Sequence, residues 1–574
     1  MTNESLYSVR TINNMKDLIT QSVKLFGSKN AFLVRNKQEI YEGITYSKFK
    51  DDIDAFGSAL IDLGLKDKFI AVIGENRYEW CVTYLSVVNG TGIIVPLDKE
   101  LPLPEIENLL IRSNAAAVVF SGKFSSEMGE LSKKLPTVKY FISMDADQEE
   151  YGILSFRKLV EYGKGLMNSG CGSFSDAEIN DEKMSILLFT SGTTDLAKGV
   201  MLSHKNICSN IVSVSKTVYI GSNDSSLSIL PLHHTYECTL GFLTMIYSGG
   251  TIAFNEGLKH IAKNLKEIRP TVLIAVPLIL ESMYKKIWEQ AAKKKGMKTK
   301  LKTALLISNT LNKIFRIDIR KKLFKAIHDN IGGRVRLIIS GAAAIDPDVS
   351  KGFSMMGIKV LQGYGLTECS PLVIGNRDNV YRDASVGLPI PGVEVKIVDP
   401  NQKGVGEIIT KGDNVMLGYY KNEEVTEKCM KNGWFYTGDL GYKDKAGFYY
   451  ITGRIKNVIV TKNGKNIYPE EVESYINKSP YVQESLVWGR YDEISGETHV
   501  NAQIIPNFIA IKEKLKDIHI SGDEIMRVIS DVVKGVNRDM PLYKRIRGFN
   551  IRETEFVKTT TKKIKRYVEK TGKK

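Results

Sequence analysis

The chain has 574 residues, enough for about four domain-sized units with substantial cores. Its 43% hydrophobic and 25% charged content is typical of folded soluble proteins and excludes a disordered, collagenous or disulfide-scaffold protein. The net charge is +15, but residues 285–325 hold 14 basic against 2 acidic side chains, and residues 541–574 hold 12 against 3. The remaining chain is mildly acidic, at −6, so the basic character belongs to two local patches.

The six cysteines lie at least thirty residues apart and form no C-x-x-C pair, which excludes a local zinc knuckle and indicates free thiols in a reducing compartment. No apolar stretch follows a basic start, so we expect no secretory signal. The strongest apolar run, residues 271–280, is too short to cross a bilayer. We therefore expect a cytoplasmic protein, with peripheral association at the inner face of the membrane.

Short apolar, β-branched runs alternate with longer amphipathic stretches over most of the chain. A helical stretch at 77–90 follows the first of these runs. This alternation predicts βα units around a mostly parallel sheet that is buried on both faces. The strands are expected at 69–74, 115–120, 185–190, 271–276 and 335–340.

The sequence pattern changes after about residue 384. In segments such as 393–399 and 406–412, apolar and polar residues alternate more strongly, and Gly, Asn and Asp interrupt them. This pattern predicts an antiparallel β subdomain at about 384–455. A smaller α+β unit follows from 456, with helices starting near Pro469 and Asp523 and strands at 484–489 and 498–506. We predict an α/β protein with a large N-terminal domain, 1–455, and a small C-terminal domain, 456–574.

A glycine flanked by hydroxyl side chains follows the strand at 185–190, in the sequence TSGTTDLAKGV at 190–200. Such a strand-exit loop offers backbone N–H and side-chain O–H donors to an oxyanion, and Lys198 adds a positive charge. The spacing does not match a Walker A loop, because Ala197 stands where the second glycine is needed and Gly199 where Ser or Thr should follow the lysine.

Further motifs follow in order along the chain: QGYGLTE at 362–368, YTGDLG at 436–441, TGRIKN at 452–457 and KTTTKKIKR at 558–566. With the 190–200 loop, these motifs make the chain resemble the acyl-adenylate-forming (AMP-binding) enzyme superfamily, which includes acyl-CoA synthetases, luciferases and peptide-synthetase adenylation domains. The similarity runs from GENRYEW at 74–80 to Arg566, which is most of the chain. It implies an acid–thiol ligase that uses ATP, Mg²⁺ and CoA.

The resemblance also implies roles for single residues. Thr367 would hydrogen-bond the α-phosphate, Glu368 would hold Mg²⁺, and Lys563 would offset the repulsion between the carboxylate and the α-phosphate. One charge at about 4 Å and an effective dielectric near 20 is worth roughly 4 kcal/mol, or about a thousandfold in rate. The other implied nucleotide contacts are Thr190, Ser191, Gly192, Thr193, Thr194 and Lys198 for the phosphates, Gly341, Ala343 and Tyr364 for the adenine pocket, and Asp439 and Arg454 for the ribose.

By the same resemblance, the small domain is mobile and rotates between the two half-reactions, with Lys456 as the hinge. Gly464 and Lys465 would border the channel for CoA. His234 and Gly363 would border the acyl pocket, whereas His233 is interpreted as structural.

Two positions depart from the family pattern. Asp195 and Ala197 replace the usual Gly and Pro of the phosphate loop, and an acid about 8 Å from the phosphates would weaken binding by roughly 2 kcal/mol unless it is paired or turned away. Lys562 replaces the usual Gly before Lys563, which leaves open which of the two lysines enters the site.

The long insertion between residues 277 and 335 and the NGKNIYPEEVE segment resemble long-chain fatty acyl-CoA synthetases. A fatty acid substrate fits the basic stretch 285–325, which is expected to contact an anionic membrane or to be a solvated face. Three alternatives stay open: transfer to a carrier protein, a non-catalytic acyl- or nucleotide-binding homologue, and a nucleic-acid-binding protein. The last is disfavoured by the acidic remainder of the chain and by the scarcity of aromatics in the patches. Chain length and oligomeric state are left open.

Overall fold

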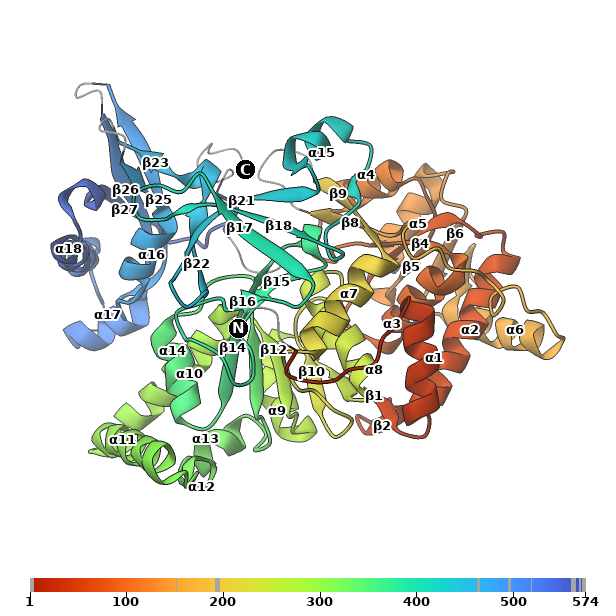
Figure 1. Ribbon diagram of the computed structural model, residues 1–574, viewed down its shortest axis with the longest axis horizontal. Coiled ribbons are helices and arrows are strands. Elements are labelled where there is room, and N and C mark those ends of the chain that lie inside the picture. The colour runs from red at the N-terminus through yellow and green to blue at the C-terminus, as the bar shows by residue number, and fades with distance from the viewer. Residues whose placement is uncertain are drawn as a thin grey trace. The chain divides into compact units, whose positions relative to one another are not determined.

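The computed structural model describes residues 5–150, 152–190, 197–461, 465–493, 497–517, 519–558, 564–566 and 569 (Figure 1). By its internal contacts the chain divides into two compact units. The larger unit comprises residues 1–394 and 410–435, and the smaller comprises residues 395–409 and 436–574.

A nine-stranded sheet and an eight-stranded sheet form the framework of the larger unit. The nine-stranded sheet is parallel from β1 to β14 and antiparallel at both edges. In spatial order its strands are β16 (Leu388–Pro389), β15 (Leu372–Gly375), β14 (Lys359–Gly365), β13 (Leu337–Ser340), β12 (Val272–Ala275), β10 (Ser225–Ser228), β11 (Thr251–Phe254), β1 (Asn30–Arg35) and β2 (Tyr41–Thr45).

The eight-stranded sheet has a parallel body and an antiparallel end at β8, β9 and β19. Its strands, in spatial order, are β19 (Gly418–Tyr419), β9 (Lys198–Ser203), β8 (Met184–Thr190), β4 (Gly92–Pro96), β3 (Lys68–Ile73), β5 (Ala115–Phe120), β6 (Tyr140–Ser143) and β7 (Ile153–Ser155). Their side chains are almost continuously buried in β3 and β5, as expected for strands covered on both faces.

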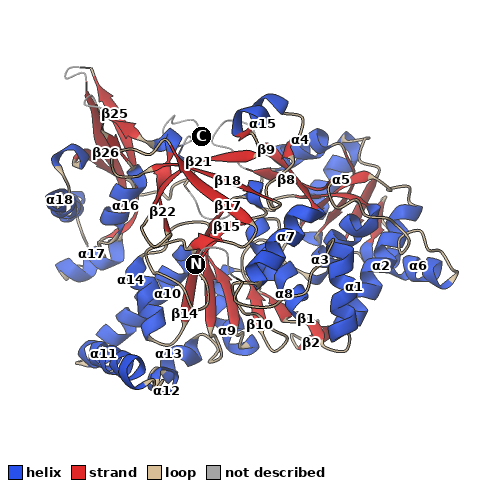
Figure 2. Cartoon of the chain, viewed as in Figure 1, coloured by secondary structure: helices blue, strands red, loops and turns tan. Residues whose placement is uncertain are grey.

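Helices cover these sheets, and Figure 2 shows the strands of the larger unit running between groups of helices. Local sequence sets several helix starts: α7 has a capping box of Ser203 and Asn206, and α10 begins at Pro277. The helices are α1 (Met15–Phe26), α2 (Tyr46–Asp62), α3 (Tyr78–Ser86), α4 (Leu103–Ser113), α5 (Ser125–Lys134), α6 (Phe156–Asn168), α7 (His204–Ser215), α8 (Thr244–Ser248), α9 (Ile261–Ile268), α10 (Pro277–Ala292), α11 (Met297–Phe315), α12 (Arg320–Leu323), α13 (Lys325–Asn330), α14 (Pro347–Met355) and α15 (Glu423–Cys429).

A five-stranded sheet follows, and the chain passes from one unit to the other within its strands. Its described pairings β20–β21 and β21–β22 are antiparallel, as the sequence predicted for this region. The strands are β17 (Val393–Val398), β18 (Gly406–Gly412), β21 (Trp434–Lys443), β20 (Met430–Lys431) and, beside β21, β22 (Tyr449–Arg454).

The rest of the smaller unit has its own apolar core around Ile476, Val487, Ile504 and Ile529. Helix α18 carries a capping box of Ser521 and Glu524 at its start. The elements are β23 (Ile459–Val460), β24 (Asn466–Ile467), α16 (Pro469–Asn477), β25 (Val482–Asp492), β26 (Glu497–Pro506), α17 (Phe508–Leu515), α18 (Gly522–Asp539) and β27 (Ile546–Ile551).

The mixed α/β class and the expected strands are confirmed. The first part of the QGYGLTE motif lies within a strand, because β14 continues through Gly365 and pairs with β15, with Tyr364 opposite Ile374. Glycine permits this continuation, because a Cβ on Gly365 would lie only 1.9 Å from the carbonyl oxygen of Pro371. Among the described residues, no helix is both long and apolar enough to cross a bilayer.

Candidate active site

The two ends of the predicted phosphate loop lie side by side in a hairpin. Thr190 ends β8 and Lys198 begins β9, and the two residues are paired across the antiparallel ladder. The Thr190 hydroxyl donates to the Lys198 carbonyl at 3.4 Å. The residues between them that were expected to bind phosphate, Ser191, Gly192, Thr193 and Thr194, lie outside the described part of the chain, as does Asp195.

Glu368 lies in a short 3₁₀ turn, Thr367–Cys369, directly after the QGYGL segment. Its Oε1 accepts a hydrogen bond from the Tyr419 hydroxyl at 2.8 Å. Tyr419 is buried, and the Lys198 ammonium lies over its ring, 5.0 Å from the centroid. The structure therefore brings together a carboxylate, a phenol and a cation from three separate segments of the chain.

Two buried asparagines hold the turn that carries Thr367 and Glu368. The side-chain amides of Asn210 and Asn414 each donate to the carbonyls of Cys369 and Leu372, at 2.8–3.3 Å. Buried backbone carbonyls need such donors, so these contacts fix the path of the turn.

The segment after β13 is adjacent to the predicted acyl pocket. A Cβ on Gly341 would lie 2.8 Å from the ring of Tyr236, whose hydroxyl donates to the carbonyls of Ala275 and Ile339 at 3.2 and 3.0 Å. Only a residue without a side chain fits at position 341. Ala343 follows two residues later.

Tyr236 belongs to the same segment as the predicted pocket histidine, His234, whose carbonyl accepts from the backbone N–H of Cys238. The rings of His233 and His234 lie 4.1 Å apart between centroids. Burial lowers the pKa of His233 to about 3, so its ring is neutral. Gly363, on β14, is also closely approached, because a Cβ there would lie 2.6 Å from Leu372 Cδ1.

In the smaller unit, Asp439 and Arg454 face each other across β21 and β22. Arg454 Nε lies 2.9 Å from Asp439 Oδ1, and Asp439 is only 3% exposed. The Asp439 N–H donates to the Thr437 hydroxyl at 3.1 Å. The two residues expected at the ribose thus form one ion pair, in which Asp439 is buried and the Arg454 side chain is 40% exposed.

Lys456 lies in the short 3₁₀ helix Ile455–Asn457 that follows β22. Lys465 places its ammonium over the Tyr543 ring, 4.7 Å from the centroid. Gly464 and Lys563 lie outside the described residues.

Residues on both sides of the 559–563 stretch are attached to the core of the smaller unit. Lys558 forms an ion pair with Glu484 at 2.8 Å, and Arg566 pairs with Glu473 at 2.5 Å. Burial raises the pKa of Glu473 to about 7, and the guanidinium of Arg566 opposes that shift. The two ends of the predicted catalytic segment are therefore fixed by charge pairs.

Two buried polar residues that the sequence did not single out belong to these networks. Tyr419 is the donor to Glu368, and only the pairing of β19 with β9 brings it there. Glu237 is 1% exposed in the π-helix η3 (Tyr236–Leu243). Its Oε1 accepts a hydrogen bond from Ser228 at 2.6 Å, and its Oε2 has no hydrogen-bond partner among the residues that the structure describes. The only sequence signal for the burial of Glu237 was its position beside an apolar run.

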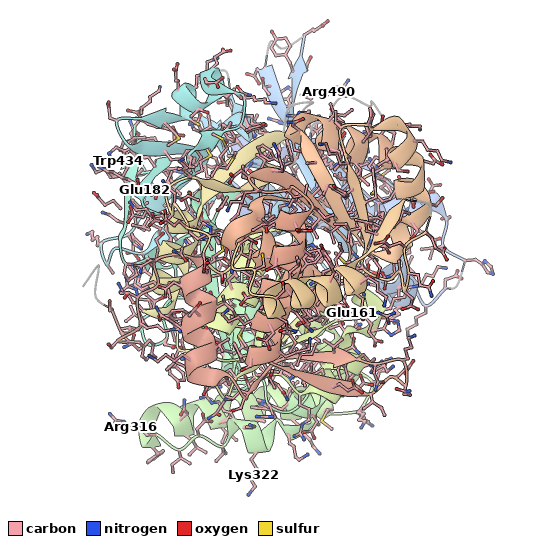
Figure 3. All side chains as sticks on the ribbon, turned by 90° about the vertical axis from the view of Figure 1, so that its right-hand side faces the viewer. Glu161, Glu182, Arg316, Lys322, Trp434 and Arg490 are labelled. Atoms are coloured by element: carbon pink, nitrogen blue, oxygen red, sulfur yellow. The ribbon has the colours of Figure 1, made fainter. Side chains whose placement is uncertain are left out.

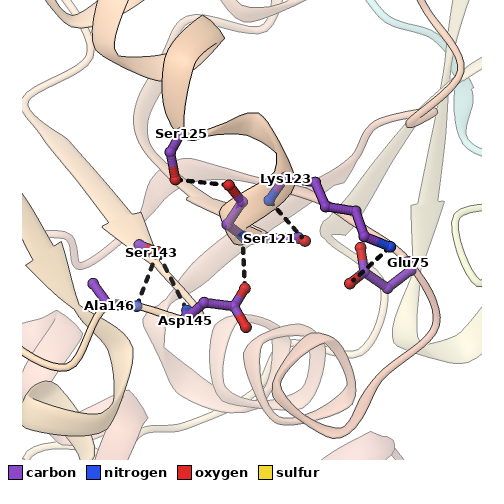
Figure 4. Close-up of a pocket in the computed structure, with 8 residues that line it drawn as sticks. Glu75, Ser121, Lys123, Ser125, Ser143, Asp145 and Ala146 are labelled. Carbon is purple, nitrogen blue, oxygen red and sulfur yellow. Dashed lines mark hydrogen bonds and ion pairs between the residues drawn. The ribbon is translucent and has the colours of Figure 1, made fainter.

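A separate cavity of about 530 Å³ lies where β3, β5 and β6 end (Figure 4). Its lining charges are already paired: Lys123 lies 3.6 Å from Glu75, and Asp145 accepts from the Gly122 N–H at 2.6 Å and pairs with Arg77. Among the described residues no group of three or more His, Cys, Asp or Glu side chains is placed to hold a metal ion.

Residues 20–420 match the family model for AMP-binding enzymes, and residues 456–571 match the model for the AMP-binding enzyme C-terminal domain. The chain therefore belongs to the AMP-binding enzyme family. With this membership, its predicted class, an AMP-forming acid–thiol ligase, is confirmed.

Among curated proteins, the chain is 31% identical to long-chain-fatty-acid–CoA ligase 5 of Rattus norvegicus, over 79% of this chain and 70% of that protein. It is 26% identical to fatty acyl-CoA synthetase B of Dictyostelium discoideum, over 92% of this chain and 83% of that protein. Among solved structures, the anthranilate CoA ligase complex with anthranoyl-AMP has a TM-score of 0.76 at 21% identity, covering 99% of this chain and 97% of that one. O-succinylbenzoate CoA synthetase from Bacillus subtilis, with ATP and magnesium, has a TM-score of 0.70 at 20% identity, covering 96% and 98%. These structural matches show the fold.

Proposed function

We propose that the protein joins a long-chain fatty acid to CoA in two steps, with ATP converted to AMP and pyrophosphate. The relatives that support this substrate class are named long-chain-fatty-acid–CoA ligases, and one is 31% identical over 79% of the chain. The observation that carries the proposal is the contact between Glu368 and Tyr419 beside Lys198, inside a chain of this family.

In the first step the fatty acid carboxylate attacks the α-phosphorus of ATP and pyrophosphate leaves. The product is a mixed anhydride whose leaving group is AMP, so a thiol can displace it in the second step. Phosphoryl transfer of this kind needs positioning and charge neutralisation more than a protein nucleophile. Lys198 and Lys563 would supply positive charge, and Thr367 a hydrogen-bond donor.

Glu368 fits a magnesium ligand, because carboxylate oxygens are the ligands that Mg²⁺ prefers and the Tyr419 hydroxyl occupies only one lone-pair direction of Oε1. Bound there, the ion would neutralise phosphate charge.

The remaining nucleotide contacts follow the family motifs. Tyr364 and the segment of Gly341 and Ala343 would receive adenine, and the Asp439–Arg454 pair would bind the ribose hydroxyls. The Asp439 side chain is buried beside Arg454, where its carboxyl oxygens would accept hydrogen bonds from the two ribose hydroxyls.

The acid would enter beside His234 and Gly363, with the thiol reaching it along Gly464 and Lys465. We place the domain boundary at residues 455 and 456, where the match to the C-terminal domain model begins. Lys456 would then be the hinge about which residues 456–574 rotate between the two steps. Peripheral contact of the basic stretch 285–325 with the membrane would bring the enzyme to its water-insoluble substrate.

The role of Lys563 is tested by separating the half-reactions. Lys563→Ala should abolish fatty-acid-dependent exchange of pyrophosphate into ATP, yet keep thioester formation from supplied acyl-adenylate. Lys562→Ala is the matched control and should keep both half-reactions. Equal loss of both half-reactions in Lys563→Ala, or loss of exchange in Lys562→Ala instead, would contradict the assignment.

The acid and acceptor are tested by AMP release over fatty, aryl and amino acids. We expect turnover with long-chain fatty acids that requires CoA. Turnover only with a phosphopantetheinylated carrier protein would indicate a carrier-protein ligase, and no acid-stimulated AMP with any acid would contradict the proposed function.

A further inference from the structure

Among the side chains that the structure describes, those of one face of helix α11 pack on the larger unit. Leu305 and Ser308 are buried, and Leu305 packs in a small apolar cluster with Phe324 and Met356. The side-chain amide of Asn309 donates to the Met355 carbonyl at 3.2 Å. These contacts fix the rotation of the helix about its axis, and hence which side chains face outward.

The outward face carries large apolar side chains instead of the polar ones expected at a surface. Residues Leu306, Ile307 and Ile314 are between 53% and 66% exposed. At 100° per residue Leu306, Ile307 and Ile314 fall within one third of the helix circumference, together with Thr303 and Thr310. We call Leu306, Ile307, Thr310 and Ile314 the outer face of α11.

Positive charges surround this face. On the helical wheel Lys300 borders one side of it and Lys302 the other, and both are exposed. Figure 3 shows Arg316 and Lys322, from the end of α11 and from α12, extending away from the ribbon. Of the two acids in 285–325, Asp318 is already paired with Arg320 at 2.6 Å.

An apolar strip bordered by cations fits few partners. Like charges would oppose a second copy of the same face, since 285–325 holds 14 basic and 2 acidic side chains. Nucleic acid would leave the aliphatic side chains without a stacking partner. An anionic bilayer satisfies both features, because the acyl boundary takes apolar side chains and each lysine or arginine near the headgroups contributes about 1 kcal/mol.

We propose that the outer face of α11 docks on an anionic lipid bilayer, with Leu306, Ile307 and Ile314 entering the headgroup–acyl boundary. The flanking lysines meet the lipid phosphates. The helix then lies in the plane of the interface, and binding depends on apolar contact as well as on charge. This goes beyond the expected charge contact of the basic stretch, and it does not depend on the chemistry of the active site.

The test is sedimentation of the full chain with vesicles of phosphatidylcholine alone or of phosphatidylcholine mixed with anionic phosphatidylglycerol. The protein should bind only the anionic vesicles. Ile307→Gln with Ile314→Gln should weaken binding at least tenfold, and so should Lys300→Glu with Lys302→Glu. Ile509→Gln, at a position 74% exposed in the smaller unit, is the matched control and should bind like the unchanged protein.

No retention on anionic vesicles would overturn the proposal. So would a loss of binding in the charge-reversed variant with full binding in the double glutamine variant, because the contact would then be electrostatic only. If the unchanged protein were dimeric and the double glutamine variant monomeric on gel filtration, the face would be a protein interface instead. Turnover of a short, water-soluble fatty acid in the variants reports the proposed ligase activity separately and should be unchanged.

Discussion

The phenolic hydroxyl of Tyr419 donates a 2.8 Å hydrogen bond to Glu368 across 51 residues of sequence. Tyr419 is fixed by the pairing of β19 with β9, and Glu368 by the turn that Asn210 and Asn414 hold. The bond orients the carboxylate before any nucleotide arrives. We therefore expect Tyr419 to act as a positioning residue, through Glu368.

Replacing Tyr419 by Phe keeps the ring under Lys198 and removes only the hydrogen bond. A hydrogen bond to a charged group contributes about 1.5–3 kcal/mol, so we expect the apparent affinity for magnesium–ATP to fall roughly ten- to a hundredfold. Calorimetric titration of magnesium–ATP measures this, and the magnesium dependence of pyrophosphate exchange should shift in parallel. Tyr420→Phe is the control; equal losses in both variants would argue against a specific role.

Gly365→Ala should disturb the turn that carries Thr367 and Glu368. Its Cβ would lie 1.9 Å from the Pro371 carbonyl oxygen, which also accepts the Leu366 N–H at 2.9 Å. Because backbone must move to relieve this overlap, we expect a stability loss of about 1–3 kcal/mol and at least tenfold weaker ATP binding. Gly129→Ala, inside helix α5 with nothing near the added Cβ, should leave ATP binding unchanged in titration and raise stability in thermal unfolding by about 0.5–1 kcal/mol.

The buried Asp439 carboxylate should discriminate the ribose hydroxyls. Asp439→Asn keeps the size of the side chain but removes the charge that pairs with Arg454. We expect ATP to bind the unchanged protein at least tenfold more tightly than 2′,3′-dideoxy-ATP, and this ratio to approach one in the variant. A ratio that the substitution leaves intact would show that Asp439 does not contact the ribose.

Glu237 should make stability depend on pH. Burial raises its pKa from 4.5 to about 8, so the folded protein binds this proton more tightly than the unfolded chain does. Its contribution to the free energy of unfolding is therefore fully present below about pH 4.5. This contribution falls by at most about 5 kcal/mol as the pH rises to 8.

Glu237→Gln cannot ionise, so the difference in melting temperature between this variant and the unchanged protein should grow in the variant's favour from pH 5 to 8. Differential scanning calorimetry across that range measures it. Glu178→Gln, at an exposed position, should track the unchanged protein at every pH. A constant difference for Glu237→Gln would refute the buried, protonated state.

The sequence alone determined the fold class, the strands of the parallel sheets and the family, because these depend on local signals. Runs such as Ala115–Phe120 are apolar and β-branched over the length of one strand, and the structure forms a strand with those bounds. The ordered motifs from Thr190 to Arg566 predicted adenylate chemistry without any knowledge of distances, because their residues and their order resemble those of a known family.

Only the tertiary structure decided which side chains act together. Tyr419 reaches Glu368 through strand pairing, and Tyr236 lies against Gly341 through the packing of η3 on the sheet; neither contact has a local sequence signal. The outer face of α11 was equally hidden, because the sequence of 297–315 does not say which side of the helix packs on Phe324 and Met356. The periodicity of a sequence indicates which residues share a helix face. Which other element packs against that face depends on contacts between segments far apart in sequence.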